Sequence, residues 1–496
     1  MTSTLTTTGT ERLFIDGEWV APADGGTERV INPATEEGFA DAPVGGLVDC
    51  DRAIAAGRKA ADDGTWANMA YRERSRRMMA FHDHLADRVD DLSGLVMREA
   101  GATQVAARHH HVLTSLKYLA FCADEAGRDR TKGLPPTVTP TAIGTNVLGA
   151  SVLLREPVGL VSAITAFNFP LYLNLQKLGP ALAMGNCVVL KPSPFTPLEA
   201  LVLGEAAEAA DLPPGVLNIV TGGADVGTAL TTDPRIDLVS FTGSDPVGVM
   251  IMQQAAVTLK RVLLELGGKS ALIVRHDADI DGAVASGLGA TITQSGQGCV
   301  LTTRHLVHNS IRADYVERLS AKLDAVVVGD PADPASVMGP LIRDAQRARV
   351  ERYVESGLSD GGRLAAGGKR PENQAKGWFY RPTLIDDVDN SWKIAQEEIF
   401  GPVAVVIGFD SDDEALRIAN DSQYGLGGHI WSADAGTAFE MAKKIRTGQV
   451  LLNGGNGTTN PWDPFGGIKR SGIGRELGEE GFLEFTEAKT IRFHAG

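Results

Sequence analysis

Short apolar runs alternate with stretches of helical periodicity through the middle of this chain. Fully buried parallel strands joined by helices have this pattern. It predicts two α/β units, with a break near residues 265–269. The first series has strands at 159–164, 187–190, 216–220, 238–241 and 271–274, and helices at 174–184, 197–210, 226–231 and 246–258. The second series follows Leu301, at 315–325, 344–356, 403–408 and 437–446.

The segments on either side of this series have other patterns. Asp16-Gly17 stands between apolar residues, which predicts a tight β-hairpin. From residue 51 to about 126, Ala, Arg and Leu recur at helical spacing. Residues 131–155 carry Pro and Gly among Thr and Val, and predict an extended arm that faces a partner. The loosely alternating stretch 482–493 predicts a second partner-facing strand.

Composition restricts the class of protein. With 496 residues the chain has room for two or three domains, and its 43% hydrophobic and 22% charged residues are those of an ordinary globular protein. A net charge of -15 argues against nucleic acid as a partner and favours small molecules. The most membrane-like run, 157–175, is interrupted by Pro157, Gly159, Asn168 and Pro170, so we expect no membrane span. Residues 1–11 predict a disordered tail without a secretory signal.

Cysteine and histidine positions give no indication of a metal. Cys50, Cys122, Cys187 and Cys299 are widely scattered without a CxxC pair, so we expect neither disulfides nor zinc, and a reducing cytoplasm. The run 109–111 is three consecutive histidines, which point in different directions on a helix and cannot converge on one ion. A solvated helix face is the expected structure there.

Cys299 is the candidate nucleophile. Gly296 and Gly298 remove side chains just before the sulfur, which allows left-handed dihedral angles and close approach of another molecule. A lone cysteine is more often a small buried hydrophobe, so this loop is not sufficient by itself.

A second candidate site follows the strand predicted at 238–241. Gly243 and Gly248 flank a strand-to-helix turn, with Asp245 suited to the N-cap and Pro246 to the first helical position. Such a turn exposes backbone N–H groups to a phosphate. A plain structural turn has the same pattern, because the spacing is not the usual dinucleotide fingerprint.

Four further stretches change the interpretation of these two candidates. They are Ala166-Phe-Asn-Phe-Pro170, Glu265-Leu-Gly-Gly-Lys269, Glu397-Glu-Ile-Phe-Gly-Pro402 and Pro464-Phe-Gly-Gly-Ile-Lys-Arg-Ser-Gly472. In this order, and with Glu265 placed 34 residues before Cys299, they make the chain resemble the aldehyde dehydrogenase superfamily from about Leu13 to Ile491.

The resemblance implies the catalytic residues and their roles. Cys299 would attack the aldehyde carbonyl, and the Asn168 amide would hold the oxyanion together with the Cys299 backbone N–H. Glu265 would be the general base that activates water to release the acid from the thioester. Lys177 would support proton movement and the placement of Asn168. A structural ion pair for Glu265 and an exposed helix position for Lys177 are the alternatives.

The resemblance also implies NAD or NADP as cofactor. Lys191 and Glu398 would contact the riboses, Phe400 the nicotinamide, and Gly243 and Ser244 the pyrophosphate. The remaining cofactor positions are Thr165, Phe167, Ser193, Leu266 and Gly267. Many NAD-preferring members carry a glutamate where this chain has Pro194, and such a carboxylate would repel a 2′-phosphate by about 4 kcal/mol at 4 Å in an effective dielectric of 20. We therefore expect NADP to be tolerated.

The expected substrate tunnel is mostly apolar and aromatic, which favours a hydrophobic or aromatic aldehyde. Gln176 stands where a bulky aromatic residue is common in the family. The positions that the resemblance assigns to the tunnel could also be ordinary core residues. They are Phe169, Leu173, Gln176, Val300, Leu301, Trp462 and Phe465.

The expected fold is α/β with three parts: a Rossmann-like NAD(P)-binding domain, a second α/β catalytic domain and a small β oligomerisation arm. We place these at residues 12–130 with 150–265, at 266–455, and at 131–149 with 480–496. The expected function is oxidation of an aldehyde to the acid by a homodimer or homotetramer. A CoA-acylating dehydrogenase, which generally lacks the Glu265 base, and a non-catalytic binding or structural relative are the alternatives.

Overall fold

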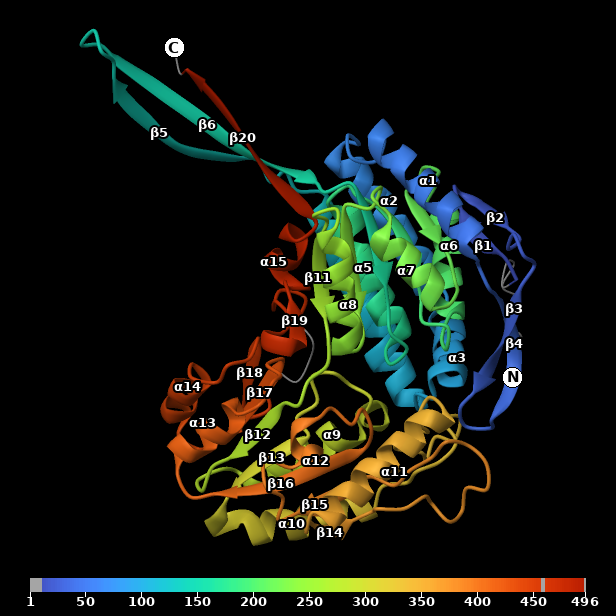
Figure 1. The fold of residues 1–496 in the computed structure, drawn as a ribbon, viewed down its shortest axis with the longest axis vertical. Helices are drawn as coiled ribbons and strands as arrows, with labels where there is room; N and C mark the ends of the chain where they lie inside the picture. The colour runs from blue at the N-terminus through green and yellow to red at the C-terminus, as the bar shows by residue number, and fades with distance from the viewer. Residues whose placement is uncertain (1–10, 456–459, 495–496) are drawn as a thin grey trace.

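The computed structural model describes residues 11–455 and 460–494, and shows two lobes with a long β arm projecting from the upper one (Figure 1). Apart from Glu11, the tail predicted at residues 1–11 lies outside the described residues. Each lobe is built on one sheet, so the prediction of an α/β fold with two α/β series is confirmed.

The upper lobe contains an eight-stranded sheet in the order β19-β11-β10-β7-β8-β9-β1-β2. Strands β11, β10, β7, β8 and β9 are parallel and form the centre. The hairpin β1–β2 turns at Asp16 and Gly17, both with positive φ, as predicted. The strands are β1 (Leu13–Ile15), β2 (Glu18–Val20), β7 (Leu160–Ile164), β8 (Cys187–Lys191), β9 (Leu217–Ile219), β10 (Leu238–Thr242), β11 (Arg261–Glu265) and β19 (Gly472–Ile473).

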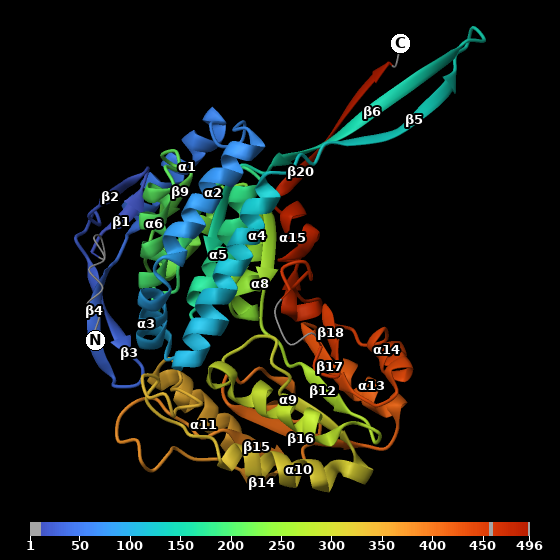
Figure 2. The same ribbon diagram turned by 180° about the vertical axis from the view of Figure 1, so that it is seen from behind.

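Helices lie on both faces of this sheet, with α7 and α8 towards the viewer in Figure 1 and α2 and α4 in Figure 2. Every residue of β7, β8 and β10 is buried as a result, which explains why these strands are continuous apolar runs in the sequence. The helices are α1 (Leu47–Asp63), α2 (Tyr71–Ala86), α3 (Val89–Ala100), α4 (Thr114–Ala126), α5 (Pro170–Ala183), α6 (Leu198–Ala209), α7 (Ala224–Thr232) and α8 (Asp245–Ala256), with a π-helical segment η1 (Ala106–Leu113) before α4.

The lower lobe contains a seven-stranded sheet in the order β14-β15-β16-β13-β12-β17-β18. All neighbouring strands are parallel except β14 and β15. The strands are β12 (Ala271–Val274), β13 (Arg304–His308), β14 (Arg363–Ala366), β15 (Thr383–Asp386), β16 (Val403–Phe409), β17 (Gly427–Trp431) and β18 (Gln449–Leu452). The helices are α9 (Ile280–Ile292), α10 (Asn309–Asp324), α11 (Asp344–Ser359), α12 (Lys393–Gln396), α13 (Asp412–Asn420) and α14 (Ala435–Ala442).

The arm is a three-stranded antiparallel sheet of β5 (Lys132–Pro140), β6 (Asn146–Pro157) and β20 (Thr486–His494). The sequence prediction of an extended arm and of a late strand beside it is therefore correct in outline. The predicted start of that late strand at residue 482 is wrong, because α15 (Gly478–Leu483) precedes it. A separate hairpin of β3 (Thr27–Asn32) and β4 (Glu37–Pro43) covers the edge of the upper lobe (Figure 1).

Strand order in the upper lobe determines where a ligand can bind. The chain leaves β7 towards β8 on one side, and β10 lies on the other side. At such a switch point a crevice opens beyond the carboxyl ends of the strands. Residues that follow β7 and β10 therefore meet there, and β11 ends beside them at Glu265, just before the chain crosses to the lower lobe.

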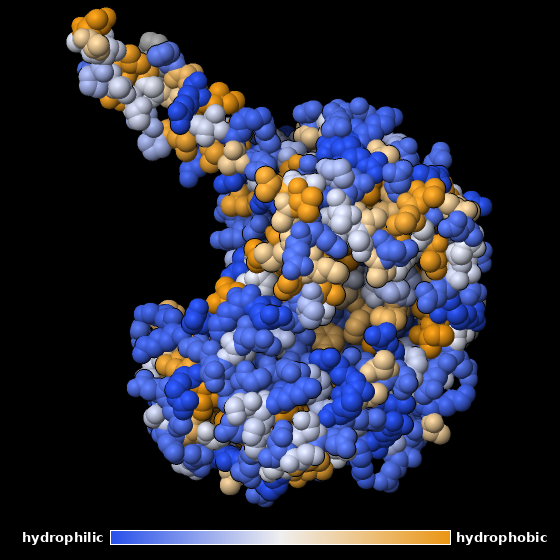
Figure 3. All heavy atoms as spheres, viewed as in Figure 1, coloured by the Kyte–Doolittle hydropathy of each residue, from blue (hydrophilic) through white to orange (hydrophobic). Residues whose placement is uncertain are grey.

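Exposed apolar side chains gather along and just after α8, and the upper lobe is visibly more hydrophobic than the lower lobe on this face (Figure 3). They are Val247, Val249, Met250, Met252, Val257 and Leu259. Within residues 11–455 and 460–494, no helix has both the length and the apolar character to cross a membrane. The same residues contain no cluster of three or more side chains suited to a metal ion.

Candidate active site

A cavity of about 620 Å³ opens between the two lobes and collects most of the predicted site residues. Cys299, Asn168 and Glu265 all lie on its wall. Predicted cofactor positions on the wall are Phe167, Gly243, Ser244, Leu266, Gly267, Glu398 and Phe400. Predicted tunnel positions on the wall are Phe169, Leu173, Gln176, Val300, Leu301 and Phe465.

A tight turn holds Cys299 in place. Gln294, Ser295 and Gly296 all have positive φ values, of 47°, 55° and 71°, in the short 3-10 turn after α9. The expectation of left-handed glycine is met at Gly296, where a side chain would collide with the backbone of Gly401, but Gly298 does not have a positive φ. Non-glycine residues in this region are strained, and surrounding contacts must hold them there.

His111 supplies one of those contacts, and the prediction of a solvated histidine face is wrong for it. Its ring is fully buried, stacks on Phe169 at 4.6 Å, and its Nε2 lies 3.1 Å from the side-chain oxygen of Gln294. Burial lowers the pKa of His111 to about 3. Three consecutive helical residues point across roughly 200° of the helix, so one of them must face the core when the helix is packed.

Asn168 reaches the cysteine loop from the other lobe. It follows β7 and precedes α5, whose first residue is Pro170. Its side-chain Nδ2 donates a hydrogen bond to the Gln297 carbonyl at 2.9 Å, and the residue is 4% exposed. One amide hydrogen is thus used to fix the side chain, and the second is free for another acceptor.

Glu265 and Cys299 lie close enough for each to shift the pKa of the other. Burial, followed by the negative charge of Glu476, raises the pKa of Glu265 well above its usual value. Burial, followed by the charges of Glu265 and Glu398, raises the pKa of the Cys299 thiol. Both groups are therefore held towards their protonated, neutral forms.

Lys177 forms a buried ion pair instead of lining the cavity. Its Nζ lies 2.7 Å from Glu476 and 3.2 Å from the Ser240 hydroxyl, and the lysine and the acid are 0% and 2% exposed. Lys177 is thus not the exposed helix lysine of the alternative interpretation. Glu476 was not predicted as a site residue, although it lies only four residues after the Pro464–Gly472 stretch.

The helix after β10 begins one residue earlier than predicted. Ser244 is the N-cap of α8 and Asp245 is its first residue, so the N-cap assignment to Asp245 was wrong. No side chain caps this end, and Asp245 instead pairs with Arg470 at 2.7 Å. The first backbone N–H groups of α8 therefore remain available to an anion at the cavity wall.

Residues 266–270 form the junction loop, which joins β11 to β12 and contacts Glu398, another carboxyl group on the cavity wall. Glu398 accepts a hydrogen bond from the Gly268 N–H at 3.0 Å, and burial raises its pKa to about 7. A Cβ on Gly268 would lie 2.5 Å from the Cys299 carbonyl, so glycine is needed where this loop meets the cysteine loop. Phe400 packs edge-on against Phe167 at 5.8 Å with a positive φ of 59°.

Five predicted site residues do not line this cavity. Lys177 is one; Thr165, Lys191 and Ser193 are buried at the ends of β7 and β8. Burial lowers the pKa of Lys191 to about 8. Trp462 is 51% exposed and packs edge-on against Phe121 at 4.7 Å.

The cavity wall also contains residues that the sequence analysis did not select: His110, Thr114, Tyr172, Gln346, Arg349, Tyr424 and Leu477. Arg349 and Gln346 donate to the backbone carbonyls of Glu398 and Phe400. They come from α11, which the sequence places far from every motif, so no local signal could have identified them.

The cavity lies at the switch point of a nucleotide-type sheet, and a partly buried thiol, an amide and a carboxyl group meet on its wall. These features place the molecule in the class of cysteine-dependent dehydrogenases. The family model described as "Aldehyde dehydrogenase family" matches residues 19–491. The chain belongs to the aldehyde dehydrogenase family, and the predicted family and enzyme class are confirmed.

Individual relatives agree over nearly the whole chain. Geranial dehydrogenase of Castellaniella defragrans is 39% identical, with 97% of this chain and 98% of the relative covered. Betaine aldehyde dehydrogenase of Bacillus subtilis is 36% identical, with 97% of each chain covered.

Solved structures give the same result. Betaine aldehyde dehydrogenase of Staphylococcus aureus in complex with NAD+ has a TM-score of 0.93 at 35% identity, with 98% of this chain and 95% of that chain covered. A cysteine-to-alanine mutant of aldehyde dehydrogenase C from Pseudomonas syringae, complexed with NAD+ and octanal, has a TM-score of 0.91 at 38% identity, with 97% and 96% covered.

Proposed function

We propose that this protein oxidises a hydrophobic aldehyde to the carboxylic acid with reduction of NAD(P)+, through a thiohemiacetal and a thioester on Cys299. The observation that carries this proposal is the shared cavity wall of Cys299, Asn168 and Glu265, with the acid close enough to the thiol to raise its pKa.

The first step transfers one proton and forms one bond. Because the Cys299 pKa is raised, the resting group is the thiol, and Glu265 in its carboxylate form accepts the thiol proton as the sulfur attacks the carbonyl carbon. The free amide hydrogen of Asn168 and the Cys299 backbone N–H then donate to the oxyanion. Removal of one such donor typically costs about 2.7 to 4 kcal/mol of transition-state stabilisation.

The residues present fit a nicotinamide cofactor. The uncapped N-terminus of α8 with Ser244 suits the pyrophosphate, and Glu398, which Gly267 leaves room for, suits a ribose hydroxyl. Lys191, Ser193, Thr165 and the remaining predicted positions would complete this site. A bound nicotinamide ring supplies the hydride acceptor. Pro194 is exposed and carries no charge, which leaves room for the 2′-phosphate of NADP.

In the hydrolysis of the thioester, Glu265 acts as the general base. As a carboxylate it takes a proton from water, the resulting hydroxide attacks the thioester carbon, and the thiolate leaves and is protonated again. The buried pair of Lys177 and Glu476 lies close enough for its acid to raise the pKa of Glu265, and we assign it the role of controlling the charge on this base.

The substrate class follows from the cavity wall, where Phe169, Leu173, Val300, Leu301 and Phe465 are apolar. The names of the relatives include geranial and octanal, which are apolar, and betaine aldehyde, which is cationic. The apolar wall favours the first two.

The three-part domain division and a homo-oligomer complete the proposal. The arm of β5, β6 and β20 exposes most of its residues, and α8 has an apolar outer face, so both suit a second copy of the chain. Cytoplasmic location fits the four free cysteines.

The test is aldehyde-dependent reduction of NAD+ and NADP+ with aromatic, terpenoid and straight-chain aldehydes. We expect turnover with both cofactors, and complete loss of turnover in Cys299→Ala with cofactor binding retained. No turnover with any aldehyde, or undiminished turnover in Cys299→Ala, would overturn the proposal. An NAD preference above about a thousandfold would overturn the electrostatic argument at Pro194 alone.

A further inference from the structure

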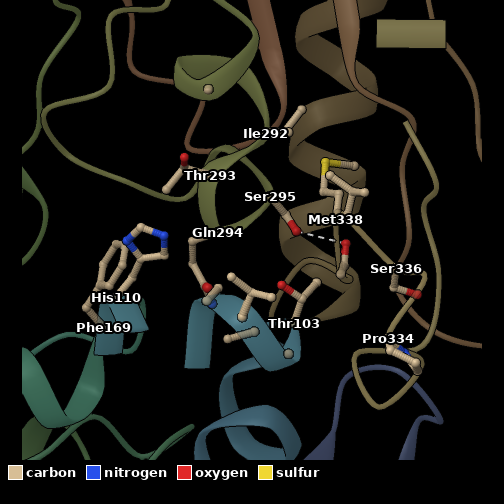
Figure 4. A pocket seen from close by; sticks show the side chains of 17 residues that line it. Thr103, His110, Phe169, Ile292, Thr293, Gln294, Ser295, Pro334, Ser336 and Met338 are labelled. Atoms are coloured by element: carbon tan, nitrogen blue, oxygen red, sulfur yellow. Dashed lines mark hydrogen bonds between the residues drawn. The ribbon is translucent and has the colours of Figure 1, made fainter. Parts of the chain in front are cut away.

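Two further cavities differ in the charge of their linings. One, of about 360 Å³, lies beside the cysteine turn, and Figure 4 shows Thr103, Gln294 and Ser295 on its wall. Among the residues that the structure describes, no Asp, Glu, Lys or Arg lines it. The other, of about 430 Å³, lies where the arm joins the upper lobe (Figure 2). We call it the arginine cavity, because four arginines line it: Arg74, Arg128, Arg130 and Arg155.

Arg74, in α2, is buried on the wall of the arginine cavity without an acidic partner. It is 4% exposed, and its Nη1 donates to the carbonyls of Trp66 and Ala67 at 3.1 and 3.3 Å. Its Nε has no hydrogen-bond partner, and the guanidinium forms no ion pair within the described ranges. The Tyr71 ring packs over it at 5.4 Å. Burial lowers the pKa of Arg74, and the charge of Arg130 lowers it further. A buried cation of this kind is normally paired with an anion.

The other three arginines have one acid between them. Arg128 and Arg130 both pair with Glu125, at 2.8 and 2.7 Å. Arg155 is half-buried in β6, and its side chain forms no ion pair with any residue that the structure describes. Two of the four arginines in this cavity therefore lack a counter-charge.

The acids on the cavity wall do not supply that counter-charge. Asp62 and Glu156 line the arginine cavity, but each pairs with a base that does not. Asp62 lies 2.7 Å from Arg58, and Glu156 lies 2.6 Å from Lys489. The wall thus keeps an excess of positive charge, although the whole chain has a net charge of -15.

The arginine cavity is open to solvent and deep enough to hold a small molecule. Several lining residues are exposed: Asp62, Asn68, Tyr71, Arg128 and Thr131. Arg74 and Met184 are buried and belong to the deeper wall. The volume lies within the roughly 300–1,000 Å³ typical of ligand sites. The lining shares no residue with the 620 Å³ cavity of the candidate active site.

We propose that the arginine cavity binds a phosphate group, either as free phosphate or as part of a small phosphate ester. A guanidinium offers two parallel N–H groups to an oxyanion. The four arginines belong to α2, to the segment after α4 and to β6, so they reach the cavity from different elements. The oxygens of a tetrahedral phosphate point in several directions, whereas those of one carboxylate lie in a plane. Bound phosphate supplies the missing counter-charge and links the arm to the upper lobe.

The test is calorimetric titration of inorganic phosphate into the full-length protein at constant ionic strength, with chloride as the other anion. Saturating NAD+ is present, because the N-terminus of α8 offers a separate anion site in the candidate active site. We expect one phosphate per chain with a Kd of about 1 mM or tighter. Absence of binding would overturn the proposal.

Arg155→Gln removes one unpaired charge without breaking an ion pair, and should weaken phosphate binding at least fivefold. The matched control is Arg492→Gln in β20 of the same arm, since Arg492 is exposed and lies outside the cavity. It should stay within twofold of the wild type. An unchanged Kd in Arg155→Gln, or an equal loss in the control, would reject the site.

Arg74→Lys tests the geometry of the buried group, because lysine keeps the positive charge but loses the guanidinium fork. We expect at least tenfold weaker phosphate binding in a variant whose circular dichroism matches the wild type. An unchanged Kd would contradict the proposal. If this variant does not fold, the comparison of Arg155→Gln with its control decides.

Two further titrations identify the source of the phosphate group. Glycerol 3-phosphate should bind more tightly than inorganic phosphate if the ligand is an ester, and equally or less tightly if it is free phosphate. Malonate, a dicarboxylate, should bind at least fivefold more weakly than the better of the two. Malonate binding as tight as that of phosphate would overturn the assignment.

Discussion

Two regions near Cys299 each bury a lysine. One lysine has a carboxylate partner for its charge and the other has no hydrogen-bond partner among the described residues. Inside the upper lobe, Lys177 lies 2.7 Å from Glu476 and also contacts Ser240. In the junction loop, Lys269 is 2% exposed, and its Nζ has no hydrogen-bond partner among the residues the structure describes. Burial, followed by the charge of Arg304, lowers the pKa of Lys269 to about 7.

The same contrast separates the acids. Glu476 accepts a hydrogen bond from Lys177 through one carboxyl oxygen, whereas Glu265 forms no ion pair with any residue that the structure describes. The ion pair of Lys177 and Glu476 is therefore expected to stabilise the fold, whereas Glu265, with its raised pKa, lies on the wall of the cavity where the chemistry is proposed.

The strongest test of this contrast is Glu265→Gln. Loss of the general base should lower steady-state kcat by about 10²- to 10⁴-fold, and should slow acid release more than the first hydride-transfer burst. The matched control is Glu199→Gln, since Glu199 is also fully buried with a raised pKa but lies in α6, away from the cavity. Stopped-flow absorbance of the reduced cofactor measures both phases. An unchanged steady-state rate would show that the base is assigned wrongly.

Breaking the compensated pair should cost stability. Lys177→Met leaves Glu476 buried without its partner, a change that costs about 3–5 kcal/mol of unfolding free energy in comparable buried pairs. The double variant Lys177→Met with Glu476→Leu should recover much of the loss, as measured by denaturant unfolding. If the single variant unfolds like the wild type, the pair is not structural.

Lys269→Met should have the opposite sign. The folded protein lowers the pKa of Lys269 from its ordinary value near 10.4 to about 7, so this lysine disfavours folding progressively as pH falls between those values. The methionine variant should therefore gain melting temperature, and gain more at pH 6.5 than at pH 10. A gain that is the same at both values would contradict an uncompensated charge.

The pH profile of the wild type should show the state of Glu265. Only its carboxylate accepts a proton, and its pKa is raised, so acid release should increase with pH above the ordinary glutamate range near 4.3. Pre-steady-state rates between pH 5 and 9 measure this. A rate already constant at pH 5 would mean that the carboxyl is not perturbed.

The smallest effect is expected at the thiol. Removal of a negative charge lowers the Cys299 pKa, so Glu265→Gln should speed alkylation of the thiol by iodoacetamide at pH 8. Glu398→Gln should speed it less, because Glu398 contributes less to the raised pKa. Equal alkylation rates in all three proteins would remove electrostatics as the cause of the shift.

The helices, strands and turns that depend on a local sequence pattern could be predicted from the sequence. Buried parallel strands such as β7 and β10 are apolar along their whole length, and the hairpin turn carries Asp16 and Gly17, so both kinds of element were found. Resemblance to a family supplied Cys299, Asn168 and Glu265, which the fold brings to one cavity.

What the sequence could not show depends on contacts between distant segments. The His111 side chain is buried because it stacks on Phe169 and forms a hydrogen bond with Gln294. Gln294 itself has a left-handed backbone conformation, which a glutamine in the sequence does not predict. Glu476 is a surface-type residue by composition and becomes internal only because Lys177 lies opposite it.

The ion pair of Lys177 and Glu476 joins residues that are 299 positions apart. During synthesis, α5 can pack on its sheet long before Glu476 is made. Lys177 would then be buried without its counterion until the entire lower lobe has been synthesised. Fragments that stop before residue 476 should therefore be poor autonomous folders. If the two lobes were expressed separately, we expect the upper lobe not to fold, although most of its strands precede the lower lobe in the sequence.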